Sequence, residues 1–235
     1  MKLLITVLAL SFSISTFAQA DLAPYRSELR AILVDSHRPL TDWKEAKKYL
    51  MQVVHLERDE DGFYIREVYC NRDVRVSVGP NKFPVNRDIN VEHTWPQSKF
   101  PKRKSIVQKS DLHHLYPTDS KANSKRGNFP FAEVIKGRSL DNCAASKKGY
   151  SSATGGDNFM PPEHQKGNVA RALFYFSVRY NVAIPDYEEV FLRQWHLLDP
   201  VDEFELRRND LIEKVQGNRN VFIDEPNYAD FIRNF

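Results

Sequence analysis

The chain has 235 residues, 34 of them Lys or Arg and 31 Asp or Glu, and a net charge of +3. A balance this small does not by itself indicate a nucleic-acid partner. The two cysteines, Cys70 and Cys143, lack the neighbours of a zinc cluster, and they could form one disulfide or remain two separate buried thiols. No internal repeat, low-complexity tract or Gly/Ser linker interrupts the sequence, so we expect a single globular domain over residues 21–235.

The N-terminal segment has the pattern of a secretory signal peptide. Lys2 supplies a positive charge, residues 3–17 are mostly apolar, and Ala18-Gln19-Ala20 is a small-residue cleavage pattern. The apolar run is shorter than the roughly 20 residues that a membrane-spanning helix requires, which makes an uncleaved anchor the weaker alternative. We therefore expect residues 1–20 to be removed and the mature chain to be exported, to the periplasm or the medium, without a membrane segment.

Hydrophobic periodicity predicts an α+β fold. Helical spacing of apolar residues predicts helices at 23–34, 40–55, 161–180, 187–197, 201–215 and 227–235. Thr41 or Asp42 is the expected cap of the second helix. Aromatic and β-branched residues or alternation predict strands at 63–69, 74–78, 89–92 and 111–116. After the last strand, Thr118 is the expected N-cap of a helix that carries Asn123.

Cations are concentrated between His93 and Phe131. The acids of this segment are Asp111 and Asp119, whereas its basic residues are Lys99, Lys102, Arg103, Lys104, Lys109, Lys121, Lys125 and Arg126. A run of surface lysines is usually a solvated loop. Because this run adjoins residues of metal-binding type, we expect Lys102 and Lys104 to contact a phosphate backbone.

Glu92, His93 and Asn123 bring a carboxylate, an imidazole and an amide oxygen to neighbouring predicted elements. Carboxylate and amide oxygens suit Mg²⁺, with Mn²⁺ and Ca²⁺ as alternatives, and leave the other ligand positions to water and phosphate. Neighbouring residues of a strand point in opposite directions, so His93 could take a proton from an attacking water. His113 and His114 suggest a zinc site, but adjacent strand residues cannot easily bind one ion, and we expect at least one to be structural.

Each of these residues also has an ordinary structural explanation. Glu92 could pair with a loop lysine, Asn123 could be a helix-surface amide, and His93 could be a buried, hydrogen-bonded imidazole. Trp95 and Phe129 could stack on bases, although packing around the hairpin is the more common role of such rings. Only the joint occurrence of these residues in one order favours the functional interpretation.

Three segments of the chain carry that order. They read Glu-His-Thr-Trp-Pro-Gln-Ser at 92–98, Asp-Leu-His-His-Leu-Tyr-Pro-Thr-Asp at 111–119 and Asn-Ser-Lys-Arg-Gly-Asn-Phe-Pro-Phe at 123–131. This set resembles the bacterial endonuclease I family of exported, sequence-nonspecific nucleases, and segments at 170–175, 195–202 and 216–224 extend the resemblance over most of the mature chain. The resemblance implies a ββα-metal (His-Me finger) core at about residues 89–128.

The resemblance also implies roles for single residues. Glu92 and Asn123 would hold the metal ion, and His93 would be the general base of an endonuclease. Such an enzyme would cut DNA, and in many members RNA, to 5′-phosphate products. Arg126 and Asn128 would face the substrate.

The chain departs from part of the family pattern. Some members have a longer, cysteine-rich insertion that carries an arginine for the scissile phosphate, whereas here the region is only Thr94 to Ser110. Arg103 is the favoured candidate for that arginine, because a guanidinium can clamp phosphate in a bidentate manner. We expect a monomer.

Two other functions remain as alternatives. An exported, noncatalytic nucleic-acid-binding protein would use the same basic loops without a metal ion. A zinc hydrolase acting on peptides or small phosphoesters would need a firmer set of His, Asp or Cys ligands. The Glu-His pair with a downstream Asn argues against both.

Overall fold

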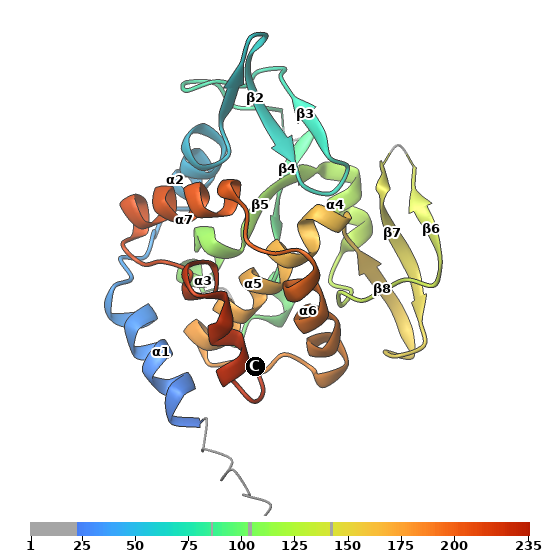
Figure 1. Ribbon diagram of the computed structural model, residues 1–235. Coiled ribbons are helices and arrows are strands. Elements are labelled where there is room, and N and C mark those ends of the chain that lie inside the picture. Colours follow the sequence, from blue (N-terminus) through green and yellow to red (C-terminus); the bar gives the residue numbers. More distant parts are fainter. Residues whose placement is uncertain (1–22, 86, 103–104, 142) are drawn as a thin grey trace, which may run out of the picture.

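The computed structural model describes residues 23–85, 87–102, 105–141 and 143–235 (Figure 1). The predicted signal peptide, Arg103 and Lys104 lie outside these described residues. Within the described part of the chain, no helix combines the length and the apolar character needed to cross a membrane.

The architecture is α+β, with small antiparallel sheets among several helices, as the sequence predicts. The helices are α1 (Ala23–Asp35), α2 (Trp43–Tyr49), α3 (Ile106–Lys109), α4 (Ser120–Arg126), α5 (Glu163–Tyr180), α6 (Asp186–Leu198), α7 (Glu203–Gln216) and α8 (Val221–Asp224). The strands are β1 (Glu57–Asp59), β2 (Gly62–Glu67), β3 (Arg72–Val74), β4 (Ile89–His93), β5 (Leu115–Asp119), β6 (Lys136–Leu140), β7 (Cys143–Ser151) and β8 (Gly156–Met160). They pair as β1-β2-β3, β4-β5 and β6-β7-β8.

The predicted helices are confirmed, with shifts at their ends. Asp42 caps α2 by accepting a hydrogen bond from the backbone N–H of Lys44, and a turn of π-helix, Leu50–Val54, continues this helix. The helix predicted at 227–235 is the exception, because 3₁₀ turns over Pro226–Phe231 take its place and the chain is irregular from Ile232.

One predicted strand is wrong and one sheet was not predicted. The strand predicted at 74–78 is replaced by β3, which ends at Val74, and the chain then turns through Ser77 with a φ of 58°. The sheet β6-β7-β8 escaped prediction because most of residues 136–151 are Lys, Gly, Ser and Ala, which have low strand propensity.

The strand predicted at 111–116 begins later than expected. Residues Leu112–His114 form one turn of 3₁₀ helix, because the Asp111 carboxylate accepts a hydrogen bond from a backbone N–H within that turn. The chain becomes extended only in β5. Asp119, rather than Thr118, then caps α4 by accepting hydrogen bonds from two backbone N–H groups of its first turn.

Two hydrophobic clusters enclose the β4-β5 pair. The larger one surrounds α5, whose residues Gln165 to Val178 are all buried, and it includes Tyr116 and Ala122. The smaller one lies beneath α2 and includes Ile89 and Val91. The hairpin β4-β5 and the helix α4 that follows it are therefore packed against apolar side chains from both sides.

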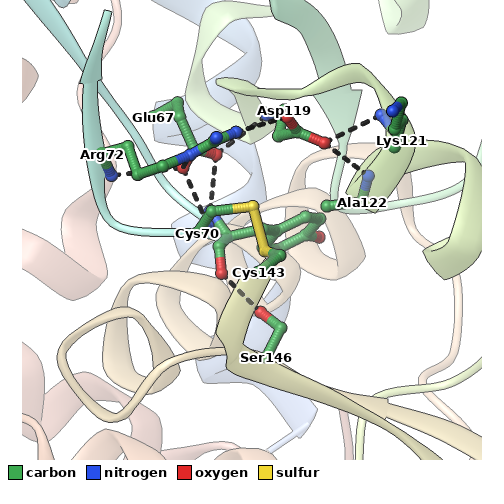
Figure 2. Close-up of a disulfide and its surroundings, with 9 residues drawn as sticks. Glu67, Cys70, Arg72, Asp119, Lys121, Ala122, Cys143 and Ser146 are labelled. Atoms are coloured by element: carbon green, nitrogen blue, oxygen red, sulfur yellow. Dashed lines mark hydrogen bonds and ion pairs between the residues drawn. A yellow bond between two sulfur atoms is a disulfide. The ribbon is translucent and has the colours of Figure 1, made fainter. Parts of the chain in front are cut away.

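A disulfide between Cys70 and Cys143 connects the β2-β3 turn to the start of β7 (Figure 2). Of the two possibilities that the sequence left open, one disulfide or two separate thiols, the structure has the disulfide. Beside it, the Glu67 carboxylate is fully buried and accepts hydrogen bonds from the backbone N–H groups of Tyr69, Cys70, Arg72 and Asp119. The last of these bonds ties the β2-β3 turn to the residue that caps α4.

We expect replacement of both cysteines, Cys70→Ser with Cys143→Ser, to lower the free energy of unfolding by about 2–4 kcal/mol. The bond spans 73 residues, so its loss restores considerable chain entropy to the unfolded state. Urea denaturation of parent and variant measures the difference. Thiol titration of the unfolded, unreduced parent provides the control, because it should detect no free thiol. Equal unfolding midpoints would contradict a stabilising role of the bond.

Candidate functional site

Most of the predicted site residues line one cavity of about 530 Å³ between β4, α4 and the start of α2. Five of the eight belong to its wall, namely Glu92, His93, Asn123, Arg126 and Asn128. Lys102 is exposed and lies outside this wall. The structure does not describe Arg103 or Lys104, so their predicted roles stay predictions.

Asn123 holds α4 against β4. Its side-chain nitrogen Nδ2 donates a hydrogen bond to the carbonyl oxygen of Val91 at 3.1 Å. Because the nitrogen is used as this donor, the amide oxygen is the atom of Asn123 that remains to bind a cation. The interaction therefore gives the side chain the orientation that a metal ligand requires.

Glu92 is almost completely buried, with 2% of its surface exposed. Its Oε1 accepts a hydrogen bond from the Tyr69 hydroxyl at 2.7 Å and lies 3.0 Å from Nη1 of Arg126. Burial raises the pKa of the Glu92 carboxyl, whereas the charge of Arg126 and the hydrogen bond from Tyr69 oppose that increase. The pairing favours the ionised carboxylate at a position where water is excluded.

Arg126 points inward, which differs from the expectation that it faces a substrate phosphate. Only 1% of its surface is exposed. Besides pairing with Glu92, its guanidinium donates hydrogen bonds to the carbonyl oxygens of His93, at 3.1 Å, and Thr94, at 2.7 Å. A buried carboxylate needs a counter-charge, and the last turn of α4 supplies it. The structure thus gives Arg126 a positioning role.

His93 is held at the end of β4 by contacts on both ring nitrogens. Its Nε2 lies 3.0 Å from the carbonyl oxygen of Lys109, and Nε2 of Gln97 lies 3.3 Å from its Nδ1. A carbonyl oxygen can only accept, so Nε2 carries the proton and Nδ1 is the basic nitrogen. Burial, followed by the charge of His114, lowers the pKa of His93 well below its usual value. The ring is neutral at pH 7.

Sequence reasoning missed three residues that shape this site. Trp43 stacks on the His93 ring, with 5.3 Å between ring centres, and Gln97 contacts Nδ1 of that ring. Tyr69 donates to Glu92 from 23 positions away in the chain. The signal for Gln97 was present in the segment 92–98, but no local pattern marks the other two.

The two adjacent histidines of the 3₁₀ turn are structural. Nε2 of His113 lies 3.0 Å from the carbonyl oxygen of Asn218, and Nε2 of His114 lies 2.6 Å from that of Gln108. Burial lowers the pKa of His113 to about 3 and that of His114 to about 4, so both rings are neutral. The strand alternation expected for this pair was wrong, because both residues lie in the 3₁₀ turn.

The donor atoms of the cavity match a cation that keeps most of its water. In the described residues, no three His, Cys, Asp or Glu side chains lie close enough together to hold a metal ion. A zinc site built from protein ligands would need such a group. One carboxylate and one amide oxygen, as Glu92 and Asn123 offer, suit Mg²⁺.

Similarity to known proteins extends along nearly the whole described chain. The profile of the Endonuclease I family matches residues 24–227. The chain belongs to the endonuclease I family. The resemblance found in the three central segments is thereby confirmed.

Several relatives of this endonuclease I family member are named as nucleases. An extracellular ribonuclease of Bacillus subtilis (strain 168) is 38% identical over 167 residues, 62% of this chain and 54% of that protein. An Endonuclease-1 of Buchnera aphidicola subsp. Acyrthosiphon pisum (strain APS) is 31% identical over 156 residues, with 57% and 59% covered. An extracellular deoxyribonuclease of Aeromonas hydrophila is 29% identical over 117 residues, 49% of each chain. The matches thus span about half of the length of these curated relatives.

Replacing Arg126 by Met tests the buried pair. Without the guanidinium, Glu92 stays buried and unpaired, so we expect the free energy of unfolding to fall by about 3–5 kcal/mol. Urea denaturation in EDTA measures the loss. The double variant Arg126→Met/Glu92→Gln serves as the control and should recover much of it, because no buried, unpaired carboxylate is left. A single variant as stable as the parent would show that the pair contributes nothing.

Proposed function

We propose that this chain is an exported, metal-dependent endonuclease that hydrolyses phosphodiester bonds of DNA and RNA without sequence specificity. One observation carries the proposal: a buried carboxylate, an amide oxygen and a neutral imidazole line the same cavity. Relatives named ribonuclease and deoxyribonuclease support activity on both nucleic acids. The hairpin β4-β5 followed by α4 would be a ββα-metal core, and the products would carry 5′-phosphates.

Glu92 and Asn123 would hold the metal ion, with Mg²⁺ favoured and Mn²⁺ or Ca²⁺ as alternatives. When bound, such an ion neutralises charge that develops on the phosphoryl group and on the leaving 3′ oxygen. Arg126 and Tyr69 keep the Glu92 carboxylate in place through contacts of 3.0 and 2.7 Å. These two contacts fix the Glu92 carboxylate before substrate binds, which limits reorganisation of the site during the reaction.

His93 would act as the general base through Nδ1. The carbonyl of Lys109 fixes the proton on Nε2, and stacking on Trp43 restricts rotation of the ring. Because the pKa of His93 is lowered by burial, the base is unprotonated at neutral pH and ready to accept a proton from water. The side-chain amide nitrogen of Gln97 lies 3.3 Å from Nδ1, so the lone pair of Nδ1 points toward Gln97.

Exposed side chains around the cavity would hold the substrate. Asn128 is exposed and donates to the Ser98 hydroxyl at 3.3 Å, and Lys102 is exposed on the neighbouring loop. We keep Arg103 as the candidate clamp for the scissile phosphate and Lys104 as a phosphate contact. Signal-peptide cleavage, export and a monomeric state belong to the same proposal, and extracellular relatives support export.

Supercoiled plasmid incubated with the purified mature chain tests the function directly. We expect nicking and then linearisation with Mg²⁺, and intact plasmid with EDTA, because the metal ion neutralises charge in the transition state. Plasmid that stays intact with every divalent cation would overturn the proposal. Plasmid that is retarded in a gel without being cut would instead favour the noncatalytic nucleic-acid-binding alternative.

His93→Ala should reduce the cleavage rate by about 10² to 10⁴-fold, because it removes a general base. Binding of DNA should be nearly unchanged, since the imidazole carries no charge at neutral pH. Initial rates on plasmid and fluorescence anisotropy in EDTA measure the two effects. His164→Ala, an exposed histidine at the start of α5, is the matched control. A full rate in the His93 variant would remove this residue from the mechanism.

Asn123→Ala should raise the Mg²⁺ concentration for half-maximal activity by at least about tenfold, because one of two protein ligands is lost. Asn123→Asp cannot donate to the Val91 carbonyl oxygen, but it keeps an oxygen ligand and adds a negative charge, so its Mg²⁺ requirement should stay closer to that of the parent. Activity followed against Mg²⁺ concentration compares the three proteins. Coincident Mg²⁺ curves for parent and Asn123→Ala would reject the assignment of this ligand.

A further inference from the structure

A second cavity, of about 670 Å³, lies between α4 and the sheet β6-β7-β8. The sheet lies beside α4 at the right of the molecule in Figure 1, away from α1 and α7. Four cations line the cavity: Lys125 from α4, Lys136 and Arg138 from β6, and Lys148 from β7. Tyr150 lies among them, and two carboxylates, Asp141 and Asp157, complete the charged lining.

The strand register gathers the basic side chains on one face of the sheet. Lys136 is paired with Tyr150 and Arg138 with Lys148, and residues directly opposite each other in an antiparallel pair point to the same side. The glycine pair between them, Gly137 and Gly149, would point to the other side. That side has no room for a side chain, because a Cβ on Gly149 would lie 2.4 Å from the Cα of Gly137.

The four cations of this cavity outnumber its two carboxylates and lack ion-pair partners within the described chain. Near β3, by contrast, Arg72 and Arg75 form ion pairs with Asp119 and Asp59. None of the four cavity cations forms an ion pair with any residue that the structure describes. Moreover, like charges placed directly opposite each other, as Arg138 and Lys148 are, destabilise a sheet. A bound anion would relieve this repulsion.

This basic face adjoins the candidate site. Lys125 lines the second cavity, and the next three residues of the chain, 126–128, line the first. Consecutive Cα atoms lie only about 3.8 Å apart, so the two cavities flank the same turn at the end of α4. Lys148 reaches across this junction, with its ammonium 3.7 Å from the centre of the Phe129 ring.

We propose that this face, the α4-β7 cradle of Lys125, Lys136, Arg138, Lys148 and Tyr150, binds the sugar-phosphate backbone of the nucleic acid that the candidate site cleaves, to one side of the cut bond. The inference rests on the proposed function. A regular polyanion satisfies several unpaired cations at once, and the half-exposed Tyr150 ring, at 49%, offers contact to a sugar or base. Contacts of this kind carry no sequence information, as a nonspecific nuclease requires.

Charge reversal on β6 tests the cradle. Lys136→Glu/Arg138→Glu is expected to raise the Kd for a labelled duplex of roughly 30 base pairs by at least about tenfold. It should also reduce the slope of log K against log salt by about 1.8, because two phosphate contacts are lost. Anisotropy in EDTA measures binding without cleavage. The variant should fold, since Arg138→Glu places an opposite charge across from Lys148, and its melting curve verifies this.

Matched variants separate the cradle from a general effect of charge. Arg30→Glu/Lys214→Glu makes the same charge change on α1 and α7, away from the cradle, and its Kd and salt slope should stay near the parent values. Tyr150→Ala should weaken binding without changing the salt slope, because it removes no charge. Lys125→Glu probes the cradle from α4, independently of the sheet.

The outcomes distinguish this inference from the proposed function. Equal losses of affinity in the β6 variant and in the α1/α7 control would overturn the cradle, and so would a parent-like salt slope in both Lys136→Glu/Arg138→Glu and Lys125→Glu. Binding is measured in EDTA, so these results do not depend on cleavage. A parent that binds the duplex but never nicks plasmid would reject the enzyme while leaving the cradle supported.

Discussion

A carboxylate and a guanidinium buried together between β4 and α4 are the interaction on which the rest of the site depends. Glu92 is 2% exposed and Arg126 is 1% exposed, so neither charge could remain there without the other. The same guanidinium binds the carbonyl oxygens of His93 and Thr94. One side chain therefore connects the proposed metal ligand, the strand end that carries the proposed base, and the helix that carries Asn123.

The helix α4 could not hold this arrangement alone, because a helix of seven residues is unstable in isolation. Carboxylates secure both of its ends. At the first turn, Asp119 caps the helix while its own backbone N–H donates to Glu67, beside the disulfide. At the last turn, Glu92 pairs with Arg126. The order of this short helix thus comes from tertiary contacts, and the β2-β3 turn belongs to the site's support.

The sequence predicted the parts of the structure that local patterns encode. The segments 92–98 and 123–131 predicted a hairpin and helix around one cavity, because their chemistry lies within short stretches of chain. Tyr69 and Trp43 escaped prediction because their roles depend on packing of distant elements. The sheet β6-β7-β8 has little strand propensity, and tertiary constraints hold it instead: the bond at Cys143 and the burial of Phe159 in the main core.

Cations divide into two groups with different physical roles. Arg126 belongs to the basic segment between His93 and Phe131, yet it is buried and donates hydrogen bonds to backbone carbonyl oxygens. Arg208 is also buried and donates to the carbonyl oxygens of Leu112 and Leu115. These interactions are shielded from salt because they are buried. The exposed lysines around α4 and β6 act through solvent, where screening is strong. Chemistry at the candidate site and affinity for a polyanion therefore rest on separate side chains, and ionic strength should change the second far more than the first.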